Sequence, residues 1–178
     1  MRNMFKFILS FFAFDSDVFY KLIKIDENLY EARIKKRPID VEELSKHENI
    51  ISLDCSNCGL TELPRDLDRL KNLKRLNCSR NQLETLPDNL DQLEELDCSR
   101  NKLKIIPNTF CRLKVLNCSY NSVVFLPDTL IQLEELYCEP NSLLFGIPDS
   151  FKKMKKFNDN DYGDYPTMQW YLNFAKNN

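Results

Sequence analysis

Apolar and polar residues alternate at a fixed spacing through the middle of the chain. Five copies of one pattern begin at Ile50, Leu73, Leu93, Leu113 and Leu133. The second copy reads LKRLNCSRNQLETLPDNLDQ, and in it Leu76 and Cys78 alternate with Arg75 and Asn77. A period of two is typical of a half-buried strand. Each copy is therefore predicted to begin with a short strand that turns its leucine and cysteine inward.

Cysteine marks the same position in every copy. The residues concerned are Cys55, Cys78, Cys98, Cys118 and Cys138, whereas Cys58 and Cys111 fall outside the row. Thiols stacked on parallel strands keep their Cβ atoms about 4.8 Å apart, beyond the ~3.8 Å typical of a disulfide. We therefore interpret the row as small buried apolar residues. Seven reduced cysteines also predict an intracellular, cytoplasmic protein.

Asparagine and proline recur behind the strands. Asn81, Asn101, Asn121 and Asn141 form one row, in which an amide can bond to backbone groups of neighbouring copies. The prolines Pro64, Pro87, Pro107, Pro127 and Pro148 form another. Proline disfavours helix propagation, so the return path is expected to be extended, with at most a short helical turn.

The pattern L-x-x-L-x-C-x-x-N-x-L-x-x-L-P, over residues 50 to about 151, resembles the leucine-rich repeat. The resemblance implies an α/β repeat fold: a solenoid with a short parallel sheet on its concave face, capped by helical N- and C-terminal segments. The 20-residue middle copies are similar to those of bacterial effectors, whereas the 23-residue first copy is closer to those of intracellular signalling scaffolds. The resemblance also implies protein–protein interaction, in an effector-like role that could include delivery into a host cell.

Three segments are predicted from this register: a helical cap over 1–48, five repeats over 49–157 and a second cap over 158–178. Asp40 to Glu43 forms a capping box that predicts a helix to about Lys46. Val18, Phe19, Leu22 and Ile23 suggest an earlier amphipathic helix, and Pro166 could open one carrying Trp170, Leu172 and Phe174. For residues 7–14 we favour a cap helix over a targeting segment, mainly because the cysteines are typical of a cytosolic protein and also because a small-x-small cleavage site is lacking.

Composition argues against several function classes. The 25 basic and 27 acidic residues give a formal charge of −2, unlike the basic excess of proteins that bind nucleic acid or membrane surfaces. His47 is the only histidine, and the three glycines form no phosphate-binding loop. Cys55 and Cys58 form a C-x-x-C that could be a redox pair or half a zinc site, but Cys58 occupies the asparagine position, which favours a structural role. No enzyme, cofactor or metal site is predicted; thiol chemistry at Cys58 or Cys111 is an alternative.

Function is then expected on the outward strand face. The predicted protein-binding residues are Arg75, Asn77, Arg80, Glu95, Asp97, Arg100, Val115, Asn117, Tyr120, Glu135 and Tyr137. Exposed tyrosines beside mixed charge are typical of protein interfaces. Two alternatives stay open. The charges could simply pair between strands, as Arg75 with Glu95, or an otherwise monomeric chain could be a scaffold that self-associates through residues 1–14.

Overall fold

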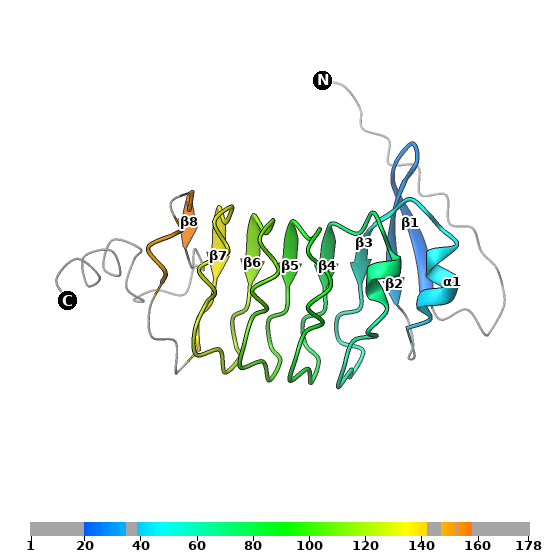
Figure 1. The fold of residues 1–178 in the computed structure, drawn as a ribbon. Coiled ribbons are helices and arrows are strands. Elements are labelled where there is room, and N and C mark those ends of the chain that lie inside the picture. The colour runs from blue at the N-terminus through cyan, green and yellow to red at the C-terminus, as the bar shows by residue number, and fades with distance from the viewer. Residues whose placement is uncertain (1–19, 35–38, 142–146, 152, 158–178) are drawn as a thin grey trace, which may run out of the picture.

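The computed structural model describes residues 20–34, 39–141, 147–151 and 153–157. Its centre is one eight-stranded sheet whose strands lie side by side in chain order (Figure 1). The strands are β1 (Tyr20–Asp26), β2 (Leu29–Ile34), β3 (Ile50–Asp54), β4 (Arg75–Asn77), β5 (Glu95–Asp97), β6 (Val115–Asn117), β7 (Glu135–Tyr137) and β8 (Lys156–Phe157). From β2 to β8 all neighbours are parallel. The chain thus forms a solenoid, as predicted.

The strand register confirms the predicted rows. Arg75 pairs with Glu95, Leu76 with Leu96, and Asn77 with Asp97, and the same offset recurs across β3–β7. The inward leucines are at most 2% exposed and all five row cysteines are fully buried. One continuous core therefore runs along the solenoid beneath the sheet.

The asparagine row joins each copy to the one before it. Asn81 Nδ2 donates to the carbonyl oxygens of Cys55 and Cys78, at 3.0 and 2.9 Å. Its Oδ1 accepts from the N–H groups of Cys58 and Leu60, at 3.1 and 2.9 Å. Asn101, Asn121 and Asn141 make the corresponding bonds in later copies. The row satisfies backbone groups that burial would otherwise leave without partners.

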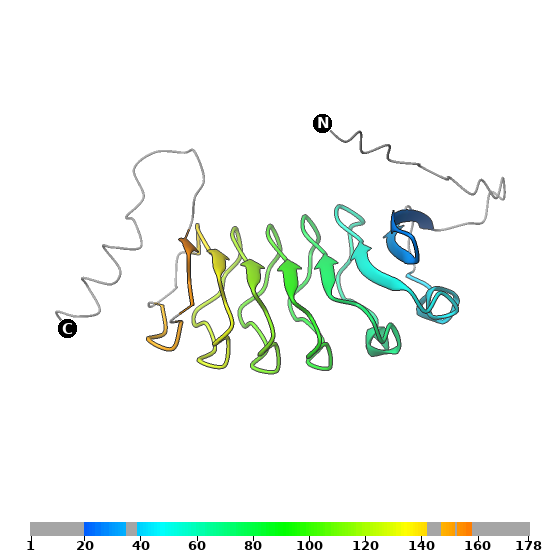
Figure 2. The same ribbon diagram turned by 90° about the horizontal axis from the view of Figure 1, so that it is seen from above.

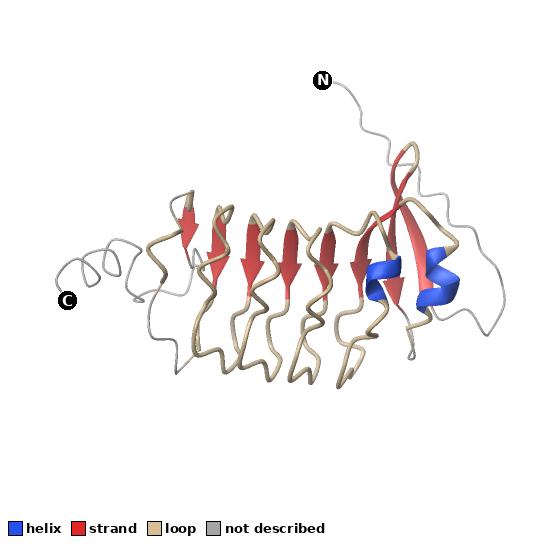
Figure 3. Cartoon of the chain, in the orientation of Figure 1, coloured by secondary structure: helices blue, strands red, loops and turns tan. Residues whose placement is uncertain are grey.

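In the described residues, the return segments contain almost no helix. Seen from above, each copy forms one turn of a coil (Figure 2), and the return segments of the later copies are loops (Figure 3). The exception is η1 (Leu67–Arg69), a single 3₁₀ turn in the longer first copy. An extended return path with at most a short helical turn is therefore confirmed.

The prediction of a helical N-terminal cap was wrong for residues 20–34. These residues form the antiparallel hairpin β1–β2, with a two-residue turn at Glu27 and Asn28. The hairpin turns Ala32 and Ile34 into the core, and β2 pairs with β3. By pairing with β3, strand β2 provides partners for backbone groups that the edge of β3 would otherwise leave unpaired.

The short helix predicted from the capping box is confirmed as α1 (Val41–Ser45). Asp40 lies at its N-terminus and accepts a hydrogen bond from the Glu43 N–H at 2.8 Å. Val41 and Leu44 bury the helix against the core. The predicted helix at Trp170, the cap helix favoured for residues 7–14 and the self-association through residues 1–14 all lie outside the described residues.

At the C-terminal end β8 adds a strand beyond the fifth copy. Lys155 and Lys156 are exposed and form ion pairs with Glu134 and Glu135 at 2.6 and 2.8 Å. These two lysines therefore join the segment around β8 to the fifth copy. No helix among the described residues is long and apolar enough to cross a bilayer.

Candidate protein-binding face

The outward side chains of β3–β7 form a surface that we call the sheet face. At its centre is a shallow hollow with a cavity volume of about 330 Å³. The residues that line it are Ser52, Arg75, Leu76, Asn77, Glu95, Leu96, Asp97, Val115, Asn117 and Tyr137. Seven of the predicted binding residues are among them. The other four, Arg80, Arg100, Tyr120 and Glu135, do not line the hollow.

Several of the predicted binding residues are already engaged in local structure. Asp97 accepts a hydrogen bond from the Ser99 N–H at 3.0 Å, and Asn77 and Asn117 accept the same bond from Ser79 and Ser119. These are Asx turns, which end each strand and fix the side chain. All three residues line the hollow, so this row contributes polar side chains held in place by their turns.

A second row borders the strands where each of them ends, and we call it the rim row. It consists of Asn57, Arg80, Arg100 and Tyr120, all exposed and all with φ between 53° and 57°. This left-handed conformation costs a non-glycine residue about 1–2 kcal/mol. Hydrogen bonds between copies hold it, as from Arg80 N to Ser99 O and from Arg100 N to Ser119 O, both 2.9 Å. The rim side chains are therefore presented on a fixed backbone.

Ion pairs between neighbouring copies form at Glu94, one residue before Glu95, for which a pair with Arg75 was suggested. Glu94 bonds to Lys74 at 2.8 Å and to Lys114 at 2.6 Å, which links three copies. Arg75 and Glu95 are neighbours in register, but among the described residues no ion pair joins them. The suggestion that Arg75 pairs with Glu95 was therefore wrong, although Glu135, at the same position in the fifth copy, does pair with Lys156.

The Glu94 ion pairs predict a dependence of stability on pH. Hydrogen bonds from Lys114 and Lys74 lower the pKa of Glu94 from 4.5 to about 2. A carboxylate with a lowered folded-state pKa stabilises the fold fully above 4.5 and loses this contribution as the pH falls towards 2. We expect Glu94→Gln to make the unfolding free energy less steeply dependent on pH in that interval. Denaturant titrations from pH 6 to 2 would measure it; the exposed Glu84→Gln is the control, and equal slopes in both variants would contradict the assignment.

Aromatic side chains complete the face in the fourth and fifth copies. The Arg100 guanidinium carbon lies 4.1 Å from the centre of the Tyr120 ring, in a cation–π contact. Tyr137 lines the hollow and its hydroxyl donates to Glu135 at 3.2 Å. The structure thus places both predicted tyrosine anchors on one surface, Tyr137 in the hollow and Tyr120 on the rim.

The seven cysteines are not joined by disulfide bonds. All seven cysteines are described and are thiols. Burial, reinforced by neighbouring thiols and carboxylates, raises the pKa of Cys55 and Cys98 well above the ordinary value. Cys58 Sγ donates to the Ser56 and Ile34 carbonyls, at 3.4 and 3.8 Å, much as the asparagine amides do in later copies. Among the described residues, no group of three or more potential ligands could hold a metal ion.

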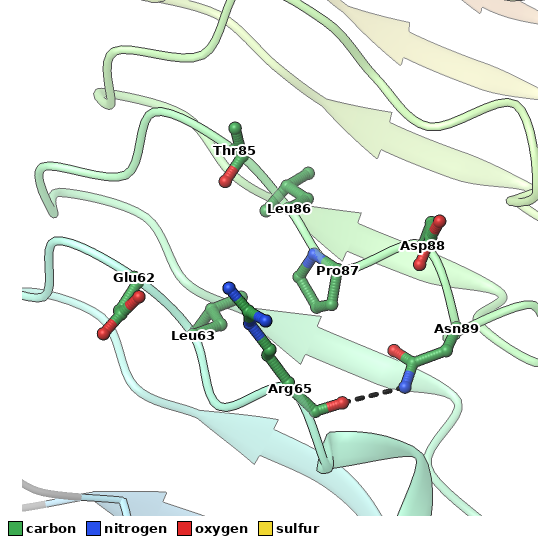
Figure 4. A pocket seen from close by; sticks show the side chains of 8 residues that line it. All are labelled: Glu62, Leu63, Arg65, Thr85, Leu86, Pro87, Asp88 and Asn89. Carbon is green, nitrogen blue, oxygen red and sulfur yellow. Dashed lines mark hydrogen bonds between the residues drawn. The ribbon is translucent and has the colours of Figure 1, made fainter.

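A larger hollow, with a cavity volume of about 500 Å³, was missed by the sequence reasoning (Figure 4). It lies between the return segments of the first two copies and is lined by Glu62, Leu63, Arg65, Thr85, Leu86, Pro87, Asp88 and Asn89. Asn89 Nδ2 donates to the Arg65 carbonyl at 2.8 Å across it. The only signal was the unequal length of these two copies. None of its lining residues belongs to the sheet face.

Comparison with known families agrees with the repeat register. A family model for two copies of leucine-rich repeats matches residues 48–92, and a model for a single leucine-rich repeat matches residues 92–113. Residues 48–113 of the chain are therefore leucine-rich repeats. Domains of this family are typically interaction modules without enzymatic activity, and they use the exposed strand surface for binding.

A solved leucine-rich-repeat protein from Leptospira interrogans is similar to this chain at 24% identity and a TM-score of 0.47. The match covers 74% of this chain and 42% of the other, so the chain spans less than half of that protein's length. No curated protein sequence matches this chain.

Proposed function

We propose that this leucine-rich-repeat chain binds a protein partner through the sheet face. The main support is the hollow above β3–β7. It is lined by the charged Arg75 and Glu95 together with the aromatic Tyr137 and the apolar Val115. Tyrosine and arginine are the side chains most often found as anchors in protein interfaces. The rim row adds Tyr120 beside the same strands.

The size of the sheet also favours this function. At ~4.8 Å per strand, five strands would span about 24 Å, whereas the eight strands of the sheet span roughly 38 Å. A standard interface covers about 800 Å² of each partner. The hairpin β1–β2 and strand β8 therefore lengthen the surface towards what a stable complex requires.

An intracellular site of action is part of the proposal. Seven thiols, five of them fully buried in one row, suit a reducing compartment. The effector-like role rests on the similarity of the 20-residue copies to those of bacterial effectors. Identifying the partner tests it, because an effector would bind a protein of a host cell.

The proposal is tested by comparing the proteins captured by three forms of the chain. Tyr120→Ala/Tyr137→Ala removes both aromatic anchors, whereas Ile105→Ala/Ile131→Ala removes two exposed apolar side chains elsewhere. We expect the tyrosine variant to lose at least about tenfold of the captured partner, as removal of interface anchors does, and the isoleucine variant to retain it. Quantitative mass spectrometry of parallel pull-downs measures this. Equal capture by wild type and the tyrosine variant would refute binding through the sheet face.

A further inference from the structure

The charges of the sheet face differ in how far the protein itself neutralises them. Asp54 forms an ion pair with Arg33 at 3.2 Å, and Glu135 forms one with Lys156 at 2.8 Å. Asp97 uses one carboxylate oxygen in its Asx turn. Two of these four carboxylates are therefore neutralised within the chain, whereas Asp97 and the exposed Glu95 form no ion pair among the described residues.

The arginines of the same face are not neutralised in this way. In the ranges that the structure describes, no ion pair or side-chain hydrogen bond engages Arg75, Arg80 or Arg100. All three lie in the second and third copies, and Arg80 and Arg100 follow adjacent strands, about 4.8 Å apart along the solenoid. Three arginines without an ion pair stand against two such carboxylates, Glu95 and Asp97, so the uncompensated charge on this part of the face is positive, although the chain as a whole carries a charge of −2.

The environment of Arg100 prepares it for one kind of ligand. The guanidinium carbon of the exposed Arg100 lies over the Tyr120 ring, 4.1 Å from the ring centre, and among the described residues no hydrogen bond engages the guanidinium N–H donors. These donors lie in one plane and match the two oxygens of a carboxylate. Stacking also restricts the side chain before binding, which lowers the entropy lost when the ion pair forms.

We propose that the partner places an acidic segment across the second and third copies, with carboxylates bound by Arg80 and Arg100. The proposal rests on the proposed protein-binding function and specifies the chemistry of the partner. A nucleic acid fits less well, because its regularly spaced phosphates would also meet Glu95 and Asp97 within the hollow. A protein segment can instead present carboxylates to the arginines and neutral groups to the acids.

A random-peptide display library panned on the full chain provides the test. Peptides bound to the wild type are expected to be enriched in Asp and Glu at least about twofold over the unselected library, as charge complementarity requires. Arg80→Glu/Arg100→Glu should abolish this enrichment. The control Arg65→Glu/Arg112→Glu makes the same charge change at two exposed arginines away from the face and should preserve it. Thermal melting of both variants establishes that they are folded, and Arg80→Gln/Arg100→Gln repeats the test without charge reversal.

The outcomes separate this proposal from the function on which it rests. Selected peptides that are not acidic, but whose binding is lost in Tyr120→Ala/Tyr137→Ala, would overturn the acidic partner and leave the binding face intact. Peptides unaffected by either the arginine or the tyrosine variant, or a library with no enriched peptide, would count against both. Binding of a labelled single-stranded oligonucleotide that disappears in the arginine variant would overturn a protein as the source of the acidic groups.

Discussion

Replacing Leu96 by alanine is expected to lower the free energy of unfolding by about 2–5 kcal/mol. Leu96 is 2% exposed and lies between Leu76 and Leu116 in the central row of the sheet. In a solenoid each copy is stabilised only by its neighbours, so a cavity in the third copy weakens two interfaces. The loss is a large share of the ~5–15 kcal/mol expected for a domain.

Denaturant unfolding followed by circular dichroism measures the effect of Leu96→Ala. Ile105→Ala is the matched control, because Ile105 is 72% exposed and its truncation should change stability by no more than about 0.5 kcal/mol. Similar losses in the two variants would mean that the central row is not the core of the solenoid.

The second large effect is expected at Asn81, which joins the first two copies. Alanine there would leave the Leu60 and Cys58 N–H groups and the Cys55 carbonyl without the amide that bonds them. An unsatisfied buried polar group costs about 1–3 kcal/mol. We therefore expect Asn81→Ala to destabilise the protein by about 2–5 kcal/mol, although it removes no apolar contact.

Hydrogen exchange provides a local measurement of the same change. The amides of Leu60 and Cys58 should exchange faster in Asn81→Ala, while those of the fourth copy are little affected. The exposed Asn108→Ala is the control for loss of an asparagine side chain. Unchanged protection of Leu60 in Asn81→Ala would refute the bonding role of the amide.

The sequence predicted the solenoid because the repeat signals are redundant. Cys78, Asn81 and Pro87 each recur in later copies and each fixes the register independently. Register in turn determined which side chains face outward, and strand pairing confirmed those rows. The helix α1 was predictable for the same kind of reason, since the Asp40–Glu43 contact is local.

Features that depend on neighbouring elements were not predictable. The spacing of Leu22 and Ile23 fits a helix as well as a strand, and only the exposed edge of β3 favours the hairpin. Which charges pair across the strands was also missed, because adjacent rows offer opposite charges and only side-chain geometry selects Glu94 over Glu95. The hollow at Arg65 depends on how copies of unequal length pack together.

Binding through the sheet face is the central claim, and one affinity measurement tests it most directly. Once comparative capture has identified a partner, its Kd is measured by calorimetry for the wild type and for Tyr120→Ala/Tyr137→Ala. We predict that the variant binds at least about tenfold more weakly, while its melting temperature stays close to that of the wild type. A Kd unchanged within about twofold, in a folded variant, would contradict the claim.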